Sequence, residues 1–452
     1  MPQPHKLRYN KSMTSGSIPK KMITFALPLL MGNLFQQLYN TADSLIVGNF
    51  LGNSALAAVS SSGNLIFMLI GFFIGLSMGA GVVIARHIGA KDEEMTQVAV
   101  HTTISMGVII GVALSVIGLS CAPLILRLIG TPADVMPESL SYFRIYFLGS
   151  TGFVLYNQSV GVLRAAGDSR HPLYFLILSA LVNVVFDLLF IAVFGMGVGG
   201  AALATILSQY LSALMSLAYL TRVDETYRLI PKKCRIHTKT LLTIVRIGVP
   251  AGIQNAVIGF SNVVVQSHVN HFGKMAMAGI GAASKLEGFA FLPITSFSMA
   301  ITPFVSQNIG AKDYERARKG ARFGILCCVL MAEAIGILFF FLAPYLIAAF
   351  DRTPEVIDIG ARKLQVTTLF YCLLSLSHAV AAALRGAGKS IVPMIIMLSA
   401  WCVLRVAILE GAVMAFGHQL LTVMVVYPVT WGISSILYLV YYLRYDFRNS
   451  TL

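Results

Sequence analysis

Charged residues are scarce in this sequence. Only 12% of its 452 residues are Asp, Glu, Lys or Arg, whereas hydrophobic residues make up 57%. A soluble domain has about 25% charged residues, and a single core could not remove so much apolar surface from water. The composition therefore places the chain in a lipid bilayer.

Patterns of catalytic and metal-binding residues are also missing. The six cysteines form no CxxC pair, so we interpret them as small packing residues. No Ser-His-Asp, HExxH or paired-carboxylate pattern stands out. The segment GAGKS at 386–390 lacks the upstream glycine and the preceding strand of a phosphate-binding loop. We therefore expect no enzyme activity and no cofactor.

Long apolar runs dominate the rest of the chain, and each is long enough to cross a bilayer, which takes about 20 helical residues. Twelve such runs fall at 22–48, 54–83, 95–120, 139–162, 173–194, 198–221, 241–268, 276–305, 322–349, 364–384, 391–415 and 420–443. An even number of spans places both termini on the same side. No signal peptide is apparent before the first span.

Lys and Arg residues divide unequally between the two sides. On the side of the termini lie 25 of the 33, on the other side 5, and within spans 3. Such a bias predicts that both termini are cytoplasmic. It also explains the net charge of +14 without a nucleic-acid partner.

The two halves of the sequence repeat each other. SMGAGVVIARHIGAKDEE at 77–94 aligns with SMAITPFVSQNIGAKDYE at 298–315, and VLRAAGDSRHP at 162–172 aligns with ALRGAGKSIVP at 383–393. Both pairs have an offset of 221 residues. Because each half contains six spans, the copies share one orientation, as in two transporter lobes around a central cleft.

We therefore predict an all-α membrane protein of twelve transmembrane helices in two six-helix lobes related by a parallel internal repeat. The predicted parts are a cytoplasmic tail 1–21, an N-lobe 22–221, a cytoplasmic linker 222–240, a C-lobe 241–445 and a cytoplasmic tail 446–452. Gly71, Gly75 and Gly79 recur every four residues, which predicts close approach between helix backbones.

Apart from Arg246 and Arg322, which the count above assigns to the side of the termini, eight charged residues lie within the predicted spans, and they are Asp43, Asp187, Glu287, Glu333, Glu410, Arg144, Lys285 and Arg405. A carboxylate in the middle of a membrane helix costs about 3 kcal/mol on insertion scales, so it usually faces a cavity. Asn183 and Asp187 stand four residues apart and share one face of a helix. Asp43 and Asp187 lack a basic residue nearby in the sequence, and amide or hydroxyl residues flank both. They form a candidate site for Na⁺ or for a proton.

The roles of the other three acidic residues within the predicted spans stay open. Glu287 stands two residues from Lys285, and Glu410 stands five from Arg405, so either acid is neutralised locally or by a neighbouring helix. Glu333 has no basic residue nearby in the sequence.

Several segments together resemble the multidrug and toxic compound extrusion (MATE) transporters of the bacterial DinF-like type. They are FALPLLMGNLFQQLYNTADSLIVGNFLG, the paired IGAKD loops, LRAAGDS and LRGAGKS, NVVFD, and GAALATILSQ. The resemblance covers the chain from about Ile18 to Tyr445. It implies a monomeric exporter in the bacterial cytoplasmic (inner) membrane, with a V-shaped central cavity. Such an exporter exchanges H⁺ or Na⁺ for organic, often cationic, drugs.

The resemblance also implies site residues. A cation or proton site in the N-lobe would comprise Asp43, Asn157, Asn183, Asp187 and Thr205, with Na⁺ held by Asp43, Asn183 and Asp187. Pro28 would allow the first helix to bend. Members of the NorM type carry further acidic residues in the seventh and tenth helices. Here the corresponding stretches, 254–262 and 371–380, contain no Asp or Glu, so we expect the cation site in the N-lobe alone.

The alternative function is a flippase for lipid-linked oligosaccharides, from the related superfamily. Such a protein favours a basic cavity that holds pyrophosphate. Three basic residues against five acidic ones within spans favour a cationic or neutral cargo instead. A receptor or a channel does not explain the parallel repeat. The choice between H⁺ and Na⁺, the stoichiometry and the substrates stay open.

Overall fold

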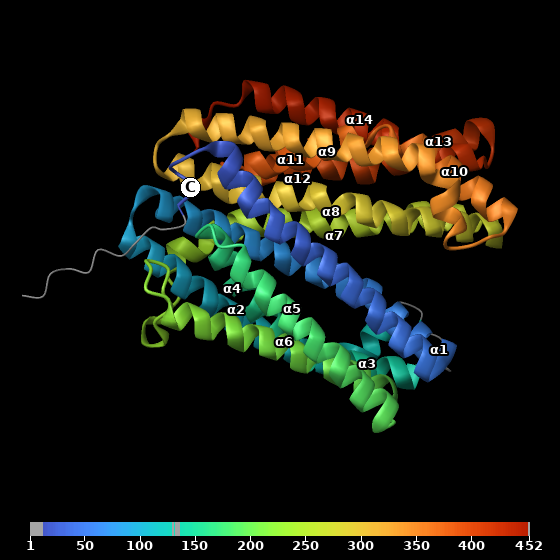
Figure 1. The fold of residues 1–452 in the computed structure, drawn as a ribbon, viewed down its shortest axis with the longest axis horizontal. Coiled ribbons are helices and arrows are strands. Elements are labelled where there is room, and N and C mark those ends of the chain that lie inside the picture. Colours follow the sequence, from blue (N-terminus) through green and yellow to red (C-terminus); the bar gives the residue numbers. More distant parts are fainter. Residues whose placement is uncertain (1–11, 129–130, 132–135, 451–452) are drawn as a thin grey trace, which may run out of the picture. The chain divides into compact units, whose positions relative to one another are not determined.

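The structure is a computed structural model that describes residues 12–128, 131 and 136–450, without the side chains of residues 44–45, 48–49, 52–70, 128, 257 and 260. Residues 1–11 of the predicted tail 1–21, and residues 451–452 of the tail 446–452, lie outside the described residues. In the described part every regular element is a helix (Figure 1).

The α-helices are α1 (Ile18–Ala90), α2 (Glu93–Leu128), α3 (Met136–Leu148), α4 (Ser150–Ala165), α5 (Arg170–Asp187), α6 (Gly197–Arg222), α7 (Thr238–Asn270), α8 (Lys274–Gly310), α9 (Tyr314–Ala348), α10 (Pro354–Thr368), α11 (Tyr371–Gly386), α12 (Ile391–Met397), α13 (Arg405–Phe416) and α14 (Leu420–Arg444). Four short elements complete the set. They are the π-helices η1 (Leu188–Val193) and η3 (Leu398–Leu404), and the 3-10 helices η2 (Pro231–Lys233) and η4 (Phe447–Asn449).

The prediction of an all-α membrane protein is confirmed. Among the described residues nine helical segments are long and apolar enough to cross a membrane, and ten if α10 and α11, bent by 53°, form one span. The predicted spans 22–48 and 54–83 fall in the single helical element α1, so the count of twelve stays a prediction. The predicted span 364–384 begins inside α10, which itself begins at Pro354.

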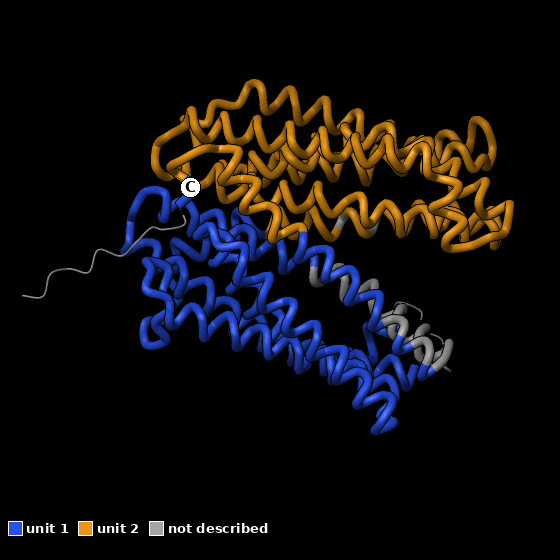
Figure 2. The backbone as a smooth tube through the Cα atoms, viewed as in Figure 1, with its two compact units in different colours: residues 1–13, 31–248 blue, residues 14–30, 249–452 orange. Residues whose placement is uncertain are grey.

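Two compact units divide the chain, and they exchange the beginnings of two helices (Figure 2). The first unit contains residues 1–13 and 31–248, and the second contains residues 14–30 and 249–452. The chain therefore passes from one unit to the other inside α1 and again inside α7. The predicted linker 222–240 lies wholly within the first unit.

Contacts within each unit show how these helix beginnings are fixed. At the start of α1, Met22 is buried in the second unit, where a Cβ added at Gly324 would come within 2.7 Å of its terminal methyl carbon. Just before α7, the backbone N–H of His237 donates to Thr102 Oγ1 of the first unit at 3.2 Å. Pro28 and Pro250 lie inside α1 and α7, each two residues from a crossing point. Proline removes one backbone hydrogen bond from a helix, so both helices are weakest against bending near these points.

Hydrogen bonds connect the linker to the start of α2. Gln97 Nε2 donates to the carbonyl oxygens of Thr226 at 2.6 Å and Arg228 at 3.0 Å. The backbone N–H of Ile230 donates to His101 Nε2 at 3.0 Å. These bonds explain why the linker belongs to the first unit. A pocket of about 930 Å³ lies between the linker and α2, lined by acidic and basic side chains.

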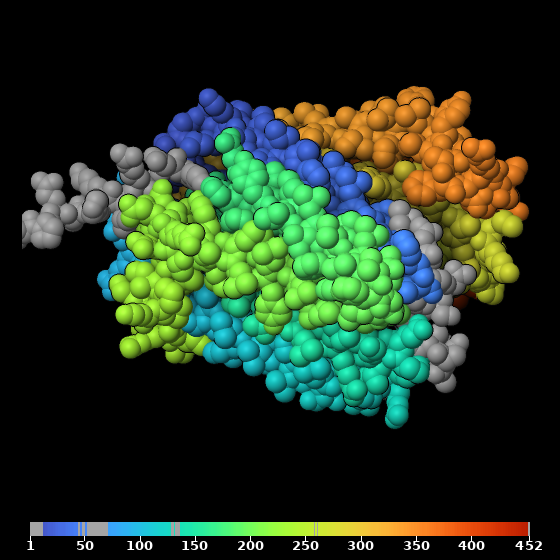
Figure 3. All heavy atoms as spheres, turned by 60° about the horizontal axis from the view of Figure 1, so that its bottom comes forward, coloured from blue at the N-terminus to red at the C-terminus, as the bar shows by residue number. Residues whose placement is uncertain are grey.

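Helices α5 and α6 lie at the surface of the first unit (Figure 3, green and yellow-green). Leu181 and Val185 on α5 are 61% and 60% exposed, whereas Asn183 and Asp187 on the same helix are 0% exposed. Apolar side chains with this exposure suit contact with lipid tails, and the polar pair avoids them.

The predicted close approach between helix backbones is confirmed for one glycine of the stripe, Gly79. A Cβ added at Gly79 would lie 2.5 Å from the backbone of Gly248 on α7 and 2.7 Å from the carbonyl oxygen of Ile244. Backbone atoms cannot move aside cheaply, so only glycine fits there.

We expect Gly79→Ala to lower the midpoint of thermal unfolding in detergent, because the added methyl would force α1 and α7 apart at a cost of about 1–3 kcal/mol. The matched control is Gly81→Ala on the same helix, where the nearest atom to an added Cβ is the carbonyl oxygen of Gly161 at 3.4 Å. Equal midpoints for the two variants would contradict this packing.

Candidate functional site

Four of the predicted site residues come together in the first unit, on α1, α5 and α6. In the amide orientation that satisfies both of its neighbours, Asn183 Nδ2 donates to Asp187 Oδ2 at 2.8 Å. In the same orientation Asn183 Oδ1 accepts from the Thr205 backbone N–H at 3.2 Å. The Asp43 side chain forms a hydrogen bond with the Asp187 side chain. The spacing of four between Asn183 and Asp187 thus turns both side chains toward one partner helix, α6, and toward α1.

The contact between Asp43 and Asp187 has a chemical consequence. Two ionised carboxylates that interact in a buried site repel each other, and a proton or a cation between them would remove this repulsion. The Oδ1 atoms of both residues are buried, and among the described residues neither has a hydrogen-bond partner. Oxygen atoms of carboxylates and amides are the ligands that hard cations prefer. The residues present therefore fit a shared proton or a Na⁺ ion.

Three tyrosines complete the surroundings of the acidic pair. The hydroxyl of Tyr39 forms a hydrogen bond with the Thr205 side chain. Tyr142 and Tyr146 stack at 6.0 Å, and both interact electrostatically with Asp43.

Sequence reasoning missed these tyrosines, although a signal existed. Tyr39 precedes Asp43 by four residues, and Tyr142 precedes Tyr146 by four, so each pair shares a helix face. Both pairs have the same spacing of four residues that identified Asn183 and Asp187.

Asn157 is not joined to this cluster by the contacts described for it. Its side-chain Nδ2 donates to the backbone carbonyl oxygen of Phe153 on the same helix at 2.9 Å. Its backbone carbonyl oxygen accepts from the Ser77 hydroxyl at 2.6 Å. The adjacent Gln158 is fully buried, and neither atom of its amide has a partner among the described residues. Pro28 lies inside α1, in the part that belongs to the second unit.

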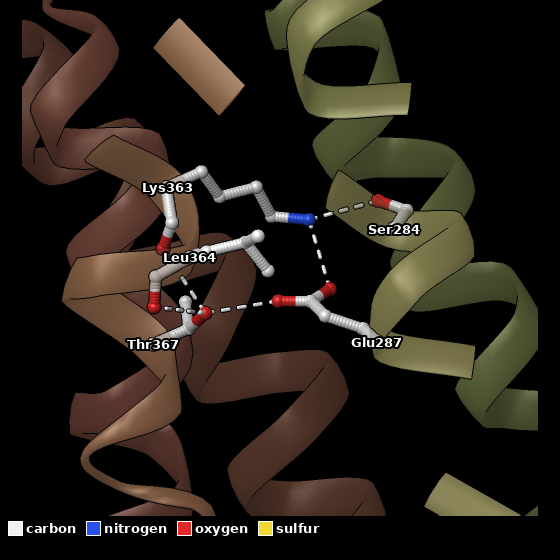
Figure 4. A network of polar contacts seen from close by, with 5 residues as sticks. All are labelled: Ser284, Glu287, Lys363, Leu364 and Thr367. Atoms are coloured by element: carbon white, nitrogen blue, oxygen red, sulfur yellow. Dashed lines mark hydrogen bonds and ion pairs between the residues drawn. The ribbon is translucent and has the colours of Figure 1, made fainter. Parts of the chain in front are cut away.

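Glu287 in the second unit forms an ion pair that the sequence did not predict (Figure 4). Its Oε2 lies 2.9 Å from Lys363 Nζ, which also donates to Ser284 Oγ at 2.8 Å, and its Oε1 accepts from Thr367 Oγ1 at 2.9 Å. The expected neighbour Lys285 is exposed. Because the predicted span began at 364, Lys363 was assigned to a loop; in the structure it is a helical residue and 3% exposed.

The remaining charged residues of the predicted spans do not pair with one another in the described part of the chain. Glu333 Oε2 accepts from the backbone N–H of Cys372 at 3.1 Å, at the start of α11. Glu410 pairs with His268 at 3.1 Å, so it does not neutralise Arg405. Arg144 is exposed.

Comparison with known proteins gives one consistent match. The MatE family model matches residues 28–189 and 250–409. The chain is 31% identical to the probable multidrug resistance protein YoeA of Bacillus subtilis over 436 residues, 94% of each chain. It is 23% identical to the multidrug export protein MepA of Staphylococcus aureus over 377 residues, 82% of each chain.

Solved structures show the same fold. A crystal structure of MATE in the straight conformation superposes with a TM-score of 0.90 at 23% identity, covering 97% of this chain and 98% of that one. A MOP superfamily transporter from Pyrococcus furiosus, described as having a binding pocket of reverse polarity that suggests a different function, superposes with a TM-score of 0.89 at 23% identity. That match covers 97% of this chain and 98% of the other.

Removing one partner of the Glu287–Lys363 pair is expected to destabilise the second unit. Loss of one partner from a fully buried pair costs about 3–5 kcal/mol. Because the Glu287 side chain is 21% exposed, we expect about 2 kcal/mol for Lys363→Met. Adding Glu287→Gln to this variant should restore part of the loss.

The measurement is the midpoint of thermal unfolding in detergent. The control is Arg362→Met, whose side chain is 65% exposed and lies 4.0 Å from Asp358; we expect no change there. If Lys363→Met melts like the control, the ion pair does not stabilise the unit.

Proposed function

Because the chain belongs to the MATE (MatE) family of transporters, we propose that it is a cation-coupled antiporter that exports organic, often cationic, compounds from the bacterial cytoplasm. Drug export is the activity named for its relatives. The contact between Asp43 and Asp187, each with a buried oxygen that lacks a described partner, carries the proposal of cation coupling. We place the protein in the cytoplasmic membrane with both termini cytoplasmic, and we propose that one copy suffices for transport.

In the proposed cycle a proton or Na⁺ ion from outside enters the space between Asp43 and Asp187. It removes the repulsion between the two carboxylates and so favours one packing of α1 against α5. The exported compound favours the other packing. Cation and compound then compete through two conformations, and each shifts the balance only by the difference in its affinity for them.

Helix α1 connects this site mechanically to the second unit. Asp43 and Tyr39 lie in the part of α1 that belongs to the first unit, while Pro28 lies in the part that packs in the second. A shift of α1 at Asp43 therefore acts on the segment that contains Pro28. A bend at this proline is how we propose that cation binding alternates access between the two sides of the membrane.

The energetics of exchange are adequate for export. Moving one charge inward releases about 2.3 kcal/mol per 100 mV, and each pH unit contributes about 1.4 kcal/mol. At 100 mV and one pH unit, one proton supports roughly a several-hundred-fold gradient of a neutral compound. A monovalent cation exchanged one for one loses the electrical contribution, so the stoichiometry decides the gradient that can be reached.

The second candidate function is transport of a lipid-linked oligosaccharide. The observation that favours it is the set of buried basic residues in the second unit, Lys363, Arg385 and Arg405. Lys363 is matched by Glu287, which leaves Arg385 and Arg405 without an acidic partner among the described residues, as charges for a pyrophosphate. Resistance of a sensitive host to dyes and fluoroquinolones separates the two functions, since a flippase would confer none.

We expect Asp187→Asn and Asp43→Asn each to abolish ethidium export by inverted membrane vesicles with an imposed cation gradient. An amide cannot take up a proton and is a weaker ligand for Na⁺. Glu410→Asn is the control, because Glu410 is half-exposed and pairs with His268 outside the cluster. Normal pumping by both aspartate variants, at matched amounts in the membrane, would show that the site is misassigned.

Tyr39→Phe tests the tyrosine that the structure adds to the site. Losing the bond to Thr205 should slow ethidium export about five- to tenfold, which corresponds to about 1 kcal/mol for one hydrogen bond. The matched control is Tyr156→Phe, whose hydroxyl bonds at 3.4 Å to the carbonyl oxygen of Pro172. If both variants export at the wild-type rate, Tyr39 takes no part in the cycle.

A further inference from the structure

Arg405 is a fully buried cation without an anionic partner in the described part of the chain. Its side chain is 1% exposed. Nε and Nη2 donate to Thr430 Oγ1 at 3.2 and 3.1 Å, and Nη1 donates to Ser261 Oγ at 3.4 Å. All these acceptors are neutral hydroxyls. Since guanidinium has five N–H groups, two donors remain for another acceptor.

The hydroxyl groups around Arg405 are oriented as acceptors. Thr430 Oγ1 donates its own proton to the carbonyl oxygen of Val426 at 2.9 Å, and Ser261 donates to the carbonyl oxygen of Trp401. Each hydroxyl therefore presents lone pairs to the guanidinium. This arrangement fixes the position of the cation but leaves its charge unmatched, which is costly in a buried site.

Aromatic rings enclose the same guanidinium. Its central carbon lies 4.7 Å from the ring centre of Tyr427 and 5.3 Å from that of Trp401. Such cation–π contacts stabilise a desolvated cation, and the rings also form flat apolar walls. Of the two ring residues, Trp401 is 3% exposed and Tyr427 is half-buried.

The second cation near Tyr427 does not add to the net charge. Lys363 Nζ lies 5.7 Å from the Tyr427 ring centre, but Glu287 matches its charge at 2.9 Å. The network around Tyr427 therefore has one net positive charge, at Arg405. One positive charge on a planar fork matches one carboxylate, held by two parallel N–H···O bonds, better than the several charges of a pyrophosphate.

The position in the fold supports a binding role. Arg405 directly follows the π-helix η3, and Asp187 directly precedes the π-helix η1. Isolated π-helical turns occur frequently at functional sites. The corresponding spans of the two halves thus carry buried charges of opposite sign beside a π-helix.

We propose that Arg405, between Tyr427 and Trp401, binds the carboxylate of an aromatic zwitterionic or anionic compound. The inference rests on the proposed export function and specifies a class of substrate for it. The basic group of a zwitterion would remain outside the Arg405 site, while the flat ring packs against the aromatic walls.

Tryptophan fluorescence tests the site directly, because both tryptophans of the chain, Trp401 and Trp431, lie in one core cluster with Tyr427 packed against it. The probes are norfloxacin, a zwitterionic fluoroquinolone, and its ethyl ester, which keeps the amine but lacks the carboxylate. Energy transfer from tryptophan to either probe reports its affinity for the full-length protein in detergent.

We expect the wild type to bind norfloxacin more tightly than the ester. Arg405→Gln should weaken norfloxacin binding about 10- to 100-fold, as expected for charged hydrogen bonds, and leave the affinity for the ester unchanged. Arg405→Lys keeps the charge in the site but loses the fork, so it should show a smaller loss for norfloxacin alone. The control Arg362→Gln, an exposed arginine of the same unit, should change neither affinity.

Equal wild-type affinities for norfloxacin and its ester would overturn the proposal. So would an equal loss for both probes in the Arg405 variants, since that is what a purely structural role predicts. Arg405→Lys decides the question if Arg405→Gln does not fold. Export of ethidium by the wild type is measured separately: its absence contradicts the export function and leaves the binding comparison intact.

Discussion

The structure depends on the cost of placing a charge inside a membrane. Three groups of charged residues within the predicted spans meet this cost in different ways. Asp43 and Asp187 lie in contact, and a proton or a cation between them would remove their repulsion. Glu287 is neutralised by Lys363 across two helices. Arg405 is surrounded by hydroxyl groups and aromatic rings without an acidic partner among the described residues. In the second case the two charges balance each other, whereas in the first and third no group of opposite charge lies among the described partners.

The sequence repeat produces two similar units with unlike sites. At the offset of 221 residues the equivalents of Asn183 and Asp187 are Leu404 and Ile408, and Arg405 stands beside Leu404. The first unit thus has a carboxylate in this span where the second has an apolar residue, and the second has a guanidinium at Arg405 where the first has Val184. Helices α1 and α7 each begin in one unit and continue in the other, with Pro28 and Pro250 near the crossing points. These two helices therefore join the first unit, which contains the proposed cation site, to the unit that contains Arg405.

Much of this arrangement is predictable from local sequence properties. Apolar length predicts the helices, the spacing of four predicts the shared face of Asn183 and Asp187, and the glycine stripe predicts the close packing at Gly79. The missed features depend on tertiary contacts. Lys363 was assigned to a loop because hydropathy alone does not reveal that α10 begins at Pro354. Nor does it reveal that Glu287 on α8 lies within ion-pair distance of Lys363. The tyrosines around Asp43, and the exchange of helix beginnings between units, likewise follow from packing between distant segments.

Counterflow in proteoliposomes tests the central claim most directly, namely that the pair Asp43–Asp187 couples export to a cation. A pH gradient and a Na⁺ gradient are imposed separately on the wild type and on the double variant Asp43→Asn/Asp187→Asn. The account predicts that one gradient drives ethidium transport in the wild type and that neither does so in the variant. Transport in the variant that still follows the same gradient would contradict it.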